Sequence, residues 1–250
     1  GREFIRWDEK RREYENQTGP VRKGIGMAIF CYKTGVYPIS LETASCRMIL
    51  NQDGSMQLQM GATEIGQGAD TVFTQMAAEV TGITEDKVNV LSTQDTDVSP
   101  FDTGAYASRQ TYVSGMAVKK TGAIFKEKIL DYAAYMLEKP QDTLDVRDNH
   151  IVDKETGTQL LPMEELATTA FYSLDRSVHI TAEATSHCKT NTFATGACFA
   201  EVEVDMPLGK VKVTNIVNVH DSGKLINPKL AAAQVHGGMS MGLGYGLSEE

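Results

Sequence analysis

A glycine-rich loop with a central amide is the first feature of the sequence that could do chemistry. The segment Gly61-Ala62-Thr63-Glu64-Ile65-Gly66-Gln67-Gly68 places Gln67 between two glycines. Glycines let the backbone approach a ligand closely, and an amide side chain can donate and accept hydrogen bonds at once. We expect the helix that follows to turn its first N–H groups toward such a ligand. The loop matches neither GxGxxG nor Walker A, and a simple strand-to-helix turn is the alternative.

A second loop gathers small and hydroxylated residues around one arginine. Thr103-Gly104-Ala105-Tyr106-Ala107-Ser108-Arg109-Gln110-Thr111 leads into a long helical pattern. Backbone N–H groups, hydroxyls and the helix dipole at such a position can bind an anion. We expect Arg109 to act through its charge, so that Arg109→Lys is milder than Arg109→Glu. If both variants kept the ligand, Arg109 would instead be a solvated surface residue or an internal ion-pair partner. A helix start that Ser108 merely caps is the alternative.

A third region combines histidines with glycines inside a helical pattern. It contains His220-Asp221-Ser222-Gly223, Asn227-Pro228 and Gln234-Val235-His236-Gly237-Gly238. Glycine in a helix interior costs ~1 kcal/mol relative to alanine, and the close approach of another helix or of a ligand would explain this pair. His220 and His236 could bind a metal ion, but hydrogen-bonded structural histidines are the simpler interpretation.

None of the three regions supplies a nucleophile with its base. Ser108 has no adjacent histidine, and Cys198 lies within a predicted strand. The cysteines are Cys31, Cys46, Cys188 and Cys198. They lie far apart without a CxxC pair, which fits neither a zinc site nor an iron–sulfur site. The sequence therefore favours free thiols and assigns no metal ligand and no catalytic residue.

Hydrophobic periodicity predicts the elements that must position these loops. It indicates helices over residues 3–16, 70–82, 111–137, 162–169 and 228–247, strands over 24–32 and 87–91, and hairpins over 43–60 and 197–219. Asp53-Gly54 supplies the tight turn of the first hairpin, and Asp70 is the expected cap of the helix after the glycine-rich loop. The pattern is typical of an α+β protein with mixed or antiparallel sheets and hairpins packed by helices. Residues 20–140 and 141–250 are possible subdomains.

Charge and composition exclude several classes of protein. The formal net charge is −9, with 41% apolar and 23% charged residues, which is ordinary for a folded protein and argues against nucleic-acid binding. No apolar run approaches the ~18 residues of a membrane span, and the first residues do not resemble a signal peptide, so a cytoplasmic location is the default expectation. Without an initiator methionine or a helix stop at the end, the chain is expected to be an interior fragment.

The three regions together resemble one family. Thr63–Gly68 is similar to the Gly-Gln-Gly loop of the molybdenum hydroxylases, the xanthine dehydrogenase and aldehyde oxidase family, and Ala107–Thr111 with Gly115 is similar to that family's second pterin-binding loop. Further matching segments follow in the family's order: Ala200–Asp205, Asp221–Gly223, Asn227-Pro228 and Gln234–Gly238. The resemblance covers essentially all 250 residues. Within the family it favours the large subunit of bacterial xanthine dehydrogenases.

The resemblance implies a cofactor and roles for individual residues. In this family molybdenum is held by the dithiolene of molybdopterin, in some members as the cytosine dinucleotide, and not by protein ligands. The implied cofactor-binding residues are Gly66, Gln67, Gly68, Ala107, Ser108, Arg109, Gln110, Thr111 and Gln234. Gln67 and Gln234 would bind the pterin, and Ala107–Thr111 would cradle a phosphate or pyrophosphate. Electrons would leave through 2Fe-2S clusters and FAD on partner chains or domains.

The sequence departs from the family pattern in its catalytic parts. The family's Gly-Gly-Phe-Gly-Gly loop, its substrate-orienting arginine region and its catalytic glutamate have no counterpart here, and neither Glu249 nor Glu250 has the right context. We therefore expect part of a cofactor cradle of an enzyme that hydroxylates hypoxanthine or xanthine with water as the oxygen source. The alternatives are an aldehyde or nicotinate-type hydroxylase subunit, and a non-catalytic pterin-binding module.

Overall fold

The protein folds into two compact units that are discontinuous in sequence. A computed structural model describes residues 1–39, 42–91 and 95–249. Unit 1 consists of Gly1–Thr34 and Thr192–Glu250, and unit 2 consists of Gly35–Asn191. The expected division at residues 20–140 and 141–250 is not the one observed, because the strand from the start of the chain pairs with a strand that begins at Thr192.

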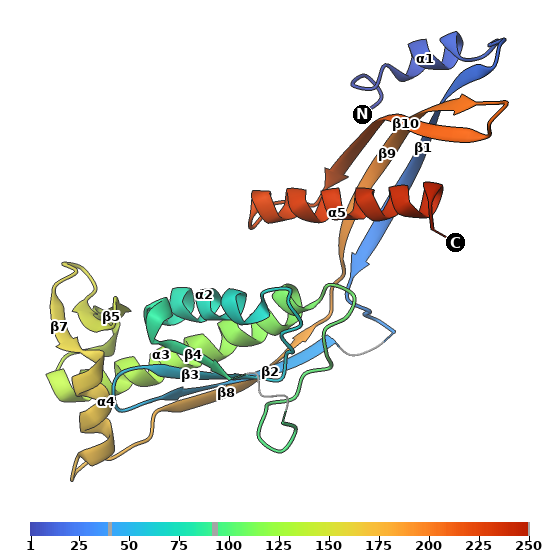
Figure 1. The fold of residues 1–250 in the computed structure, drawn as a ribbon. Helices are drawn as coiled ribbons and strands as arrows, with labels where there is room; N and C mark the ends of the chain where they lie inside the picture. Colours follow the sequence, from blue (N-terminus) through green and yellow to red (C-terminus); the bar gives the residue numbers. More distant parts are fainter. Residues whose placement is uncertain (40–41, 92–94, 250) are drawn as a thin grey trace. The chain divides into compact units, whose positions relative to one another are not determined.

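Unit 1 is built on a long antiparallel sheet of three strands in the order β1-β9-β10 (Figure 1). Its elements are α1 (Trp7–Glu13), β1 (Val21–Thr34), β9 (Thr192–Asp205), β10 (Lys210–Asp221) and α5 (Pro228–Leu247). A small buried cluster of Ile5, Ile25 and Phe199 joins α1 to this sheet. Asn227 caps α5, because its side-chain oxygen accepts hydrogen bonds from the N–H groups of Lys229 and Leu230.

Unit 2 contains a four-stranded sheet in the order β4-β3-β2-β8, with two helices packed over one of its faces (Figure 1). Its elements are β2 (Glu42–Leu50), β3 (Met56–Met60), α2 (Ala69–Thr81), β4 (Val88–Leu91), α3 (Gly115–Leu137) and β8 (Thr181–Cys188). The β3–β4 pair is parallel, and the other two pairs are antiparallel. The apolar side chains of Met56, Leu58 and Met60 point into the core, as their alternation with glutamines predicts.

A second, smaller sheet of unit 2 has the order β5-β6-β7. It is formed by β5 (Leu144–Arg147), β6 (His150–Asp153) and β7 (Gln159–Pro162), followed by α4 (Met163–Tyr172). Short 3₁₀ turns lie at Glu85–Lys87 and Gln141–Thr143, and a π-helical turn lies at Gln110–Ser114 directly before α3. Among the described residues, no helix is both long and apolar enough to cross a bilayer.

The α+β class with antiparallel and mixed sheets is confirmed. The hairpin over 43–60 turns at Gly54, whose φ is 73°, and α5 has the predicted bounds. The first helix is shorter than expected, because residues 2–6 form turns. Strand β8 was not predicted, because it carries polar residues, Thr185, Ser186 and His187, where a regular apolar alternation would be needed. The β5-β6-β7 sheet was not predicted either, because each of its strands has four residues, too few for a clear periodicity.

Helices α2 and α3 approach closely at a glycine. A Cβ atom added at Gly122 would lie 2.7 Å from Cγ1 of Val80 on α2. Contacts below 3.0 Å require the neighbouring atoms to move. The glycine therefore stays in the helix despite its low propensity because it sets the distance between the two helices that cover the sheet.

We predict that Gly122→Ala destabilises the protein. Alanine improves helix propensity by ~1 kcal/mol, but an extra methyl group in a packed interface costs ~1–3 kcal/mol, so the net change should be a loss. Gly238→Ala in α5 is the matched control, since no described atom lies within 4 Å of its Cβ position. Urea denaturation should show opposite signs for the two variants, and equal gains would contradict this packing.

Candidate functional site

The structure brings the two predicted loops of unit 2 together through their glutamines. The Gln67 side-chain amide donates a hydrogen bond to Oε1 of Gln110. Both amides also donate to the carbonyl oxygen of Thr63, at 2.9 Å from Gln67 Nε2 and 3.0 Å from Gln110 Nε2. Segments far apart in the sequence therefore form one polar surface built from amide donors and acceptors.

Open space lies beside the glycines of the first loop. Gly66 and Gly68 have φ values of 95° and 86°, a conformation that other residues rarely adopt. No described atom lies within 4 Å of the position that a Cβ would take at either glycine. Gln67 Oε1 accepts from the Ile65 N–H at 2.7 Å, and an amide oxygen has a second lone pair. The loop can thus receive a flat, heteroatom-rich ligand against its backbone.

The start of α2 is capped by Glu64. Its carboxylate accepts hydrogen bonds from the backbone N–H groups of Gly66, Gly68 and Asp70, at 2.6, 3.2 and 3.1 Å. These bonds, the one from Asp70 first, hold the pKa of Glu64 below its usual range. The expectation that Asp70 caps this helix was wrong. Among the first N–H groups of α2, that of Asp70 already donates to Glu64. The expectation that the start of this helix faces a ligand stays a prediction.

The second loop has an unusual backbone. Ala107 and Ser108 have φ values of 46° and 53°, and each such non-glycine residue costs ~1–3 kcal/mol unless its surroundings hold it. A π-helical turn, Gln110–Ser114, follows directly, and such turns occur often at functional sites. Ser108 and Thr111 are exposed at this helix start. The prediction that this loop binds an anion through hydroxyls and backbone N–H groups is compatible with this arrangement and stays a prediction.

Arg109 is wholly buried, with 0% of its surface exposed. Its Nε donates to Glu42 Oε2 at 2.7 Å, and its Nη1 donates to Asp102 Oδ1 at 2.6 Å. Further hydrogen bonds run from Nη1 to the Gly104 carbonyl and from Nη2 to the Thr43 carbonyl. The expectation that the Arg109 side chain meets an anion through its charge was therefore wrong: the guanidinium is an internal ion-pair partner.

The two carboxylates that pair with Arg109 have further hydrogen-bond donors. Asp102 Oδ2 accepts from the Ser114 hydroxyl at 2.7 Å, and the Glu42 carboxylate also accepts from the Val36 N–H. Burial alone would lower the pKa of Arg109, but the hydrogen bonds from its two carboxylate partners outweigh this and raise it. Removing one partner of such a pair typically costs ~3–5 kcal/mol, because the other charge stays buried alone.

Glu42 and Asp102 could not have been found from the sequence. They lie on β2 and in the loop before Arg109, with no local spacing that links them. An isolated acidic residue is usually solvated, and only the fold shows that both carboxylates have fully or almost fully buried side chains.

Gln234 lies in unit 1, on α5, where its side chain is exposed. The neighbouring Gly237 and Gly238 have no described atom within 4 Å of their Cβ positions. No close approach within the described residues therefore accounts for these glycines. The assignment of Gln234 to the pterin stays a prediction that rests on the family resemblance.

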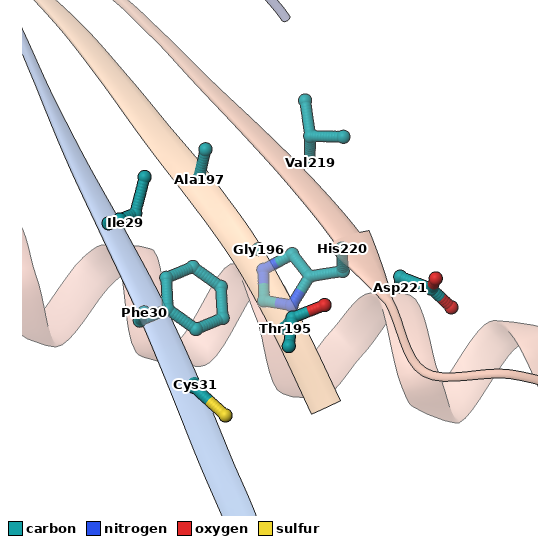
Figure 2. Close-up of a pocket in the computed structure, with 9 residues that line it drawn as sticks. All are labelled: Ile29, Phe30, Cys31, Thr195, Gly196, Ala197, Val219, His220 and Asp221. Carbon is teal, nitrogen blue, oxygen red and sulfur yellow. The ribbon is translucent and has the colours of Figure 1, made fainter. Parts of the chain in front are cut away.

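A hollow of about 720 Å³ lies on the sheet of unit 1 (Figure 2). It is lined by Ile29, Phe30, Cys31, Thr195, Gly196, Ala197, Val219, His220 and Asp221. The rings of Phe30 and His220 pack with centroids 4.9 Å apart, on either side of Gly196, which pairs with both residues. Among the described residues, no cluster of three or more histidine, cysteine or acidic side chains could hold a metal ion. His220 makes a ring contact with Phe30, and its role as a structural histidine or a metal ligand stays a prediction.

The four cysteines are unpaired in the structure. Cys46 is fully buried in the core of unit 2, and burial raises the pKa of its thiol to about 12. It is therefore a neutral thiol at physiological pH and a poor nucleophile. Cys31 is exposed on β1, and Cys188 and Cys198 have raised pKa values through desolvation.

Comparison with known proteins defines the class. A sequence model of the family described as "Molybdopterin cofactor-binding domain" matches residues 1–250, so this chain belongs to that family. The xanthine dehydrogenase molybdenum-binding subunit of Escherichia coli O157:H7 is 47% identical, over all of this chain and 33% of that protein. A probable hypoxanthine oxidase of Escherichia coli K12 is 33% identical, over all of this chain and 25% of that protein.

A solved structure agrees on the fold. Quinoline 2-oxidoreductase from Pseudomonas putida 86 matches with a TM-score of 0.78 and 23% identity, over 97% of this chain and 32% of that one. The chain spans about a third of the length of the xanthine dehydrogenase subunit that it matches. The amide groups of the two glutamine-bearing loops and the open space at Gly66 and Gly68 are compatible with the hydrogen-bonding chemistry of a pterin.

We predict that Glu64 makes the first turn of α2 sensitive to acid. Because its folded-state pKa is depressed, the stability that it adds is present above the ordinary glutamate pKa and is lost as the pH falls through the lowered value. Amide hydrogen exchange should therefore show the protection of Gly68 and Asp70 falling with acid.

In Glu64→Gln this protection should be weak at all pH values. Glu79→Gln, the same change at an exposed position on the same helix, is the control and should behave as the wild type. Equal protection in Glu64→Gln and wild type would show that Glu64 does not cap the helix.

Proposed function

We propose that this chain forms part of the cofactor-binding subunit of a xanthine dehydrogenase-type molybdenum hydroxylase, which hydroxylates hypoxanthine or xanthine with water as the oxygen source. The observation that carries the proposal is the 47% identity to a xanthine dehydrogenase molybdenum-binding subunit over the whole chain. The junction of Gln67 and Gln110 supports it, since it lies in the two segments that resemble the family's pterin-binding loops.

The residues of unit 2 would hold the cofactor from one side. Gln67 and Gln110 would exchange hydrogen bonds with the pterin, whose ring nitrogens and carbonyl need both donors and acceptors. The backbone of Gly66 and Gly68 would lie against it. Ala107, Ser108 and Thr111, at the start of the π-helical turn, would meet a phosphate or the pyrophosphate of the cytosine dinucleotide form. Bound molybdopterin supplies the molybdenum centre at which the substrate is oxidised.

The relatives support the proposed preference for a purine over other substrates. The nicotine 6-hydroxylase large subunit of Paenarthrobacter nicotinovorans is only 25% identical over 96% of this chain. Both purine-linked relatives are more similar. An aldehyde or N-heterocycle hydroxylase is the second candidate, because relatives of that kind share the fold.

We further propose that the electrons leave through 2Fe-2S clusters and FAD on partner chains or domains. The spacing of the four cysteines fits no cluster. The negative net charge argues against nucleic-acid partners. We also propose that the enzyme lies in the cytoplasm.

The direct test uses the full-length subunit purified with its partners. Molybdenum analysis and the fluorescence of released, oxidised pterin should show stoichiometric cofactor. Turnover with an artificial electron acceptor should be fastest for hypoxanthine or xanthine and slower for nicotinate and aldehydes. Cofactor with preference for nicotinate or an aldehyde would replace the substrate assignment, and cofactor without any turnover would favour a non-catalytic module.

We predict that Gln67→Ala in the full-length subunit lowers pterin content with little change in fold. The side chain is exposed, and its own hydrogen bonds go to the two loops and not to the core, so the fold should tolerate their loss. Each hydrogen bond to a buried ligand is worth ~1 kcal/mol or more. Gln75→Ala, an exposed glutamine on α2, is the control. Equal pterin content in all three proteins would remove Gln67 from the site.

We also predict that these 250 residues alone do not oxidise xanthine. They span a third of the matching relative, and the mechanism needs a positioned base, substrate contacts and an electron exit. The measurement is xanthine turnover with an artificial acceptor alongside molybdenum analysis. Steady turnover with stoichiometric molybdenum would contradict the proposal that the base, the substrate contacts and the electron exit lie outside these residues.

A further inference from the structure

We propose that Arg109, Asp102 and Glu42 are positioning residues for the cofactor, which act through the 107–110 backbone and the Gln110 side chain without touching the cofactor. The proposal rests on the proposed function and deepens it. In this proposal Arg109 does not bind an anion directly. Its internal ion pairs with Glu42 and Asp102 shape the loop that binds the cofactor.

The first support is the burial of the group. The side chains of Arg109 and Asp102 are 0% exposed and that of Glu42 is 2% exposed. The guanidinium makes its hydrogen bonds to two carboxylates and two backbone carbonyls inside the fold. To reach a ligand outside, it would have to leave two carboxylates buried without their partner, which the low polarity of the interior makes unfavourable.

The second support is the backbone that the pair anchors. Arg109 directly follows the left-handed residues Ala107 and Ser108. The Ala107 carbonyl accepts from the Gly35 N–H at 2.8 Å, and Glu42 accepts from the adjacent Val36 N–H. The same ion pair therefore holds both the loop and the segment that the loop contacts. Strained backbone of this kind persists only where surrounding contacts fix it.

The third support is that Arg109 lies next to Gln110, one of the two glutamines proposed to bind the pterin. Gln110 follows Arg109 in the chain and meets Gln67 and the Thr63 carbonyl on the first loop. Asp102 also fixes the far end of the π-helical turn through the Ser114 hydroxyl at 2.7 Å. A change at Asp102 should therefore move both ends of the turn that carries Gln110.

The experiment uses the full-length subunit with its partners and the variants Asp102→Asn and Glu42→Gln, which keep side-chain size and remove one charge. Pterin and molybdenum retained after gel filtration are measured at a temperature at which circular dichroism shows every protein folded. We expect release that is roughly 10- to 100-fold faster, as is typical when outer partners of a ligand-binding group are lost. Glu183→Gln, which breaks the half-exposed Arg47–Glu183 ion pair on the same sheet, is the control and should retain cofactor.

A double-mutant cycle tests the path. If Asp102 acts through Gln110, then Asp102→Asn should add little to the effect of Gln110→Ala, whereas additive effects would contradict that path. Wild-type retention in Asp102→Asn and Glu42→Gln would overturn the positioning role alone. Wild-type protein without pterin or molybdenum would overturn the proposed function itself. If Asp102→Asn does not accumulate, Glu42→Gln, which leaves the Asp102 pair in place, decides.

Discussion

The candidate site depends on one buried arginine. Arg109 links the start of β2, the loop around Asp102 and the turn before α3 by hydrogen bonds of 2.6–2.9 Å. Burying one cation and two carboxylates is unfavourable unless their hydrogen bonds are made, and here the partners come from separate parts of the chain. Because these hydrogen bonds join segments from separate parts of the chain, we propose that they hold the left-handed residues Ala107 and Ser108 and, through them, the position of Gln110.

The hydrophobic core of unit 2 holds the elements that carry Arg109 and its two carboxylate partners. Residues of β2 and β3 and the facing sides of α2 and α3 form one continuous buried cluster, in which Met48, Leu58, Phe73 and Phe125 are almost fully excluded from solvent. The loops that carry Gln67 and Gln110 leave this core directly before α2 and α3. The close contact at Gly122 sets the spacing of these helices. The packing of two helices on a sheet thus determines the distance between the two loops.

The sequence predicted the elements better than the contacts between them. The alternation of Met56, Leu58 and Met60 with glutamines and the turn at Gly54 were sufficient for the first hairpin, since strand periodicity is a local property. The meeting of Gln67 and Gln110 was implied only by a resemblance of two separate segments to one family. An anion contact was expected for Arg109, with an internal ion pair as one alternative, because a local pattern of hydroxyls and one arginine at a helix start looks the same whether the guanidinium points outward or inward. The capping of α2 by Glu64 was missed because the cap lies in the loop, six residues before Asp70, outside the usual capping pattern.

We propose that the two loops form one face of a molybdopterin site whose shape is set from inside by Arg109. An experimental structure of the cofactor-loaded, full-length subunit tests it most directly. In that structure we expect the side-chain amides of Gln67 and Gln110 to lie within ~3 Å of cofactor atoms, and the Arg109 guanidinium still to bind Glu42 and Asp102. A guanidinium that has left its carboxylates and binds a cofactor phosphate, or a pterin bound away from both glutamines, would contradict it.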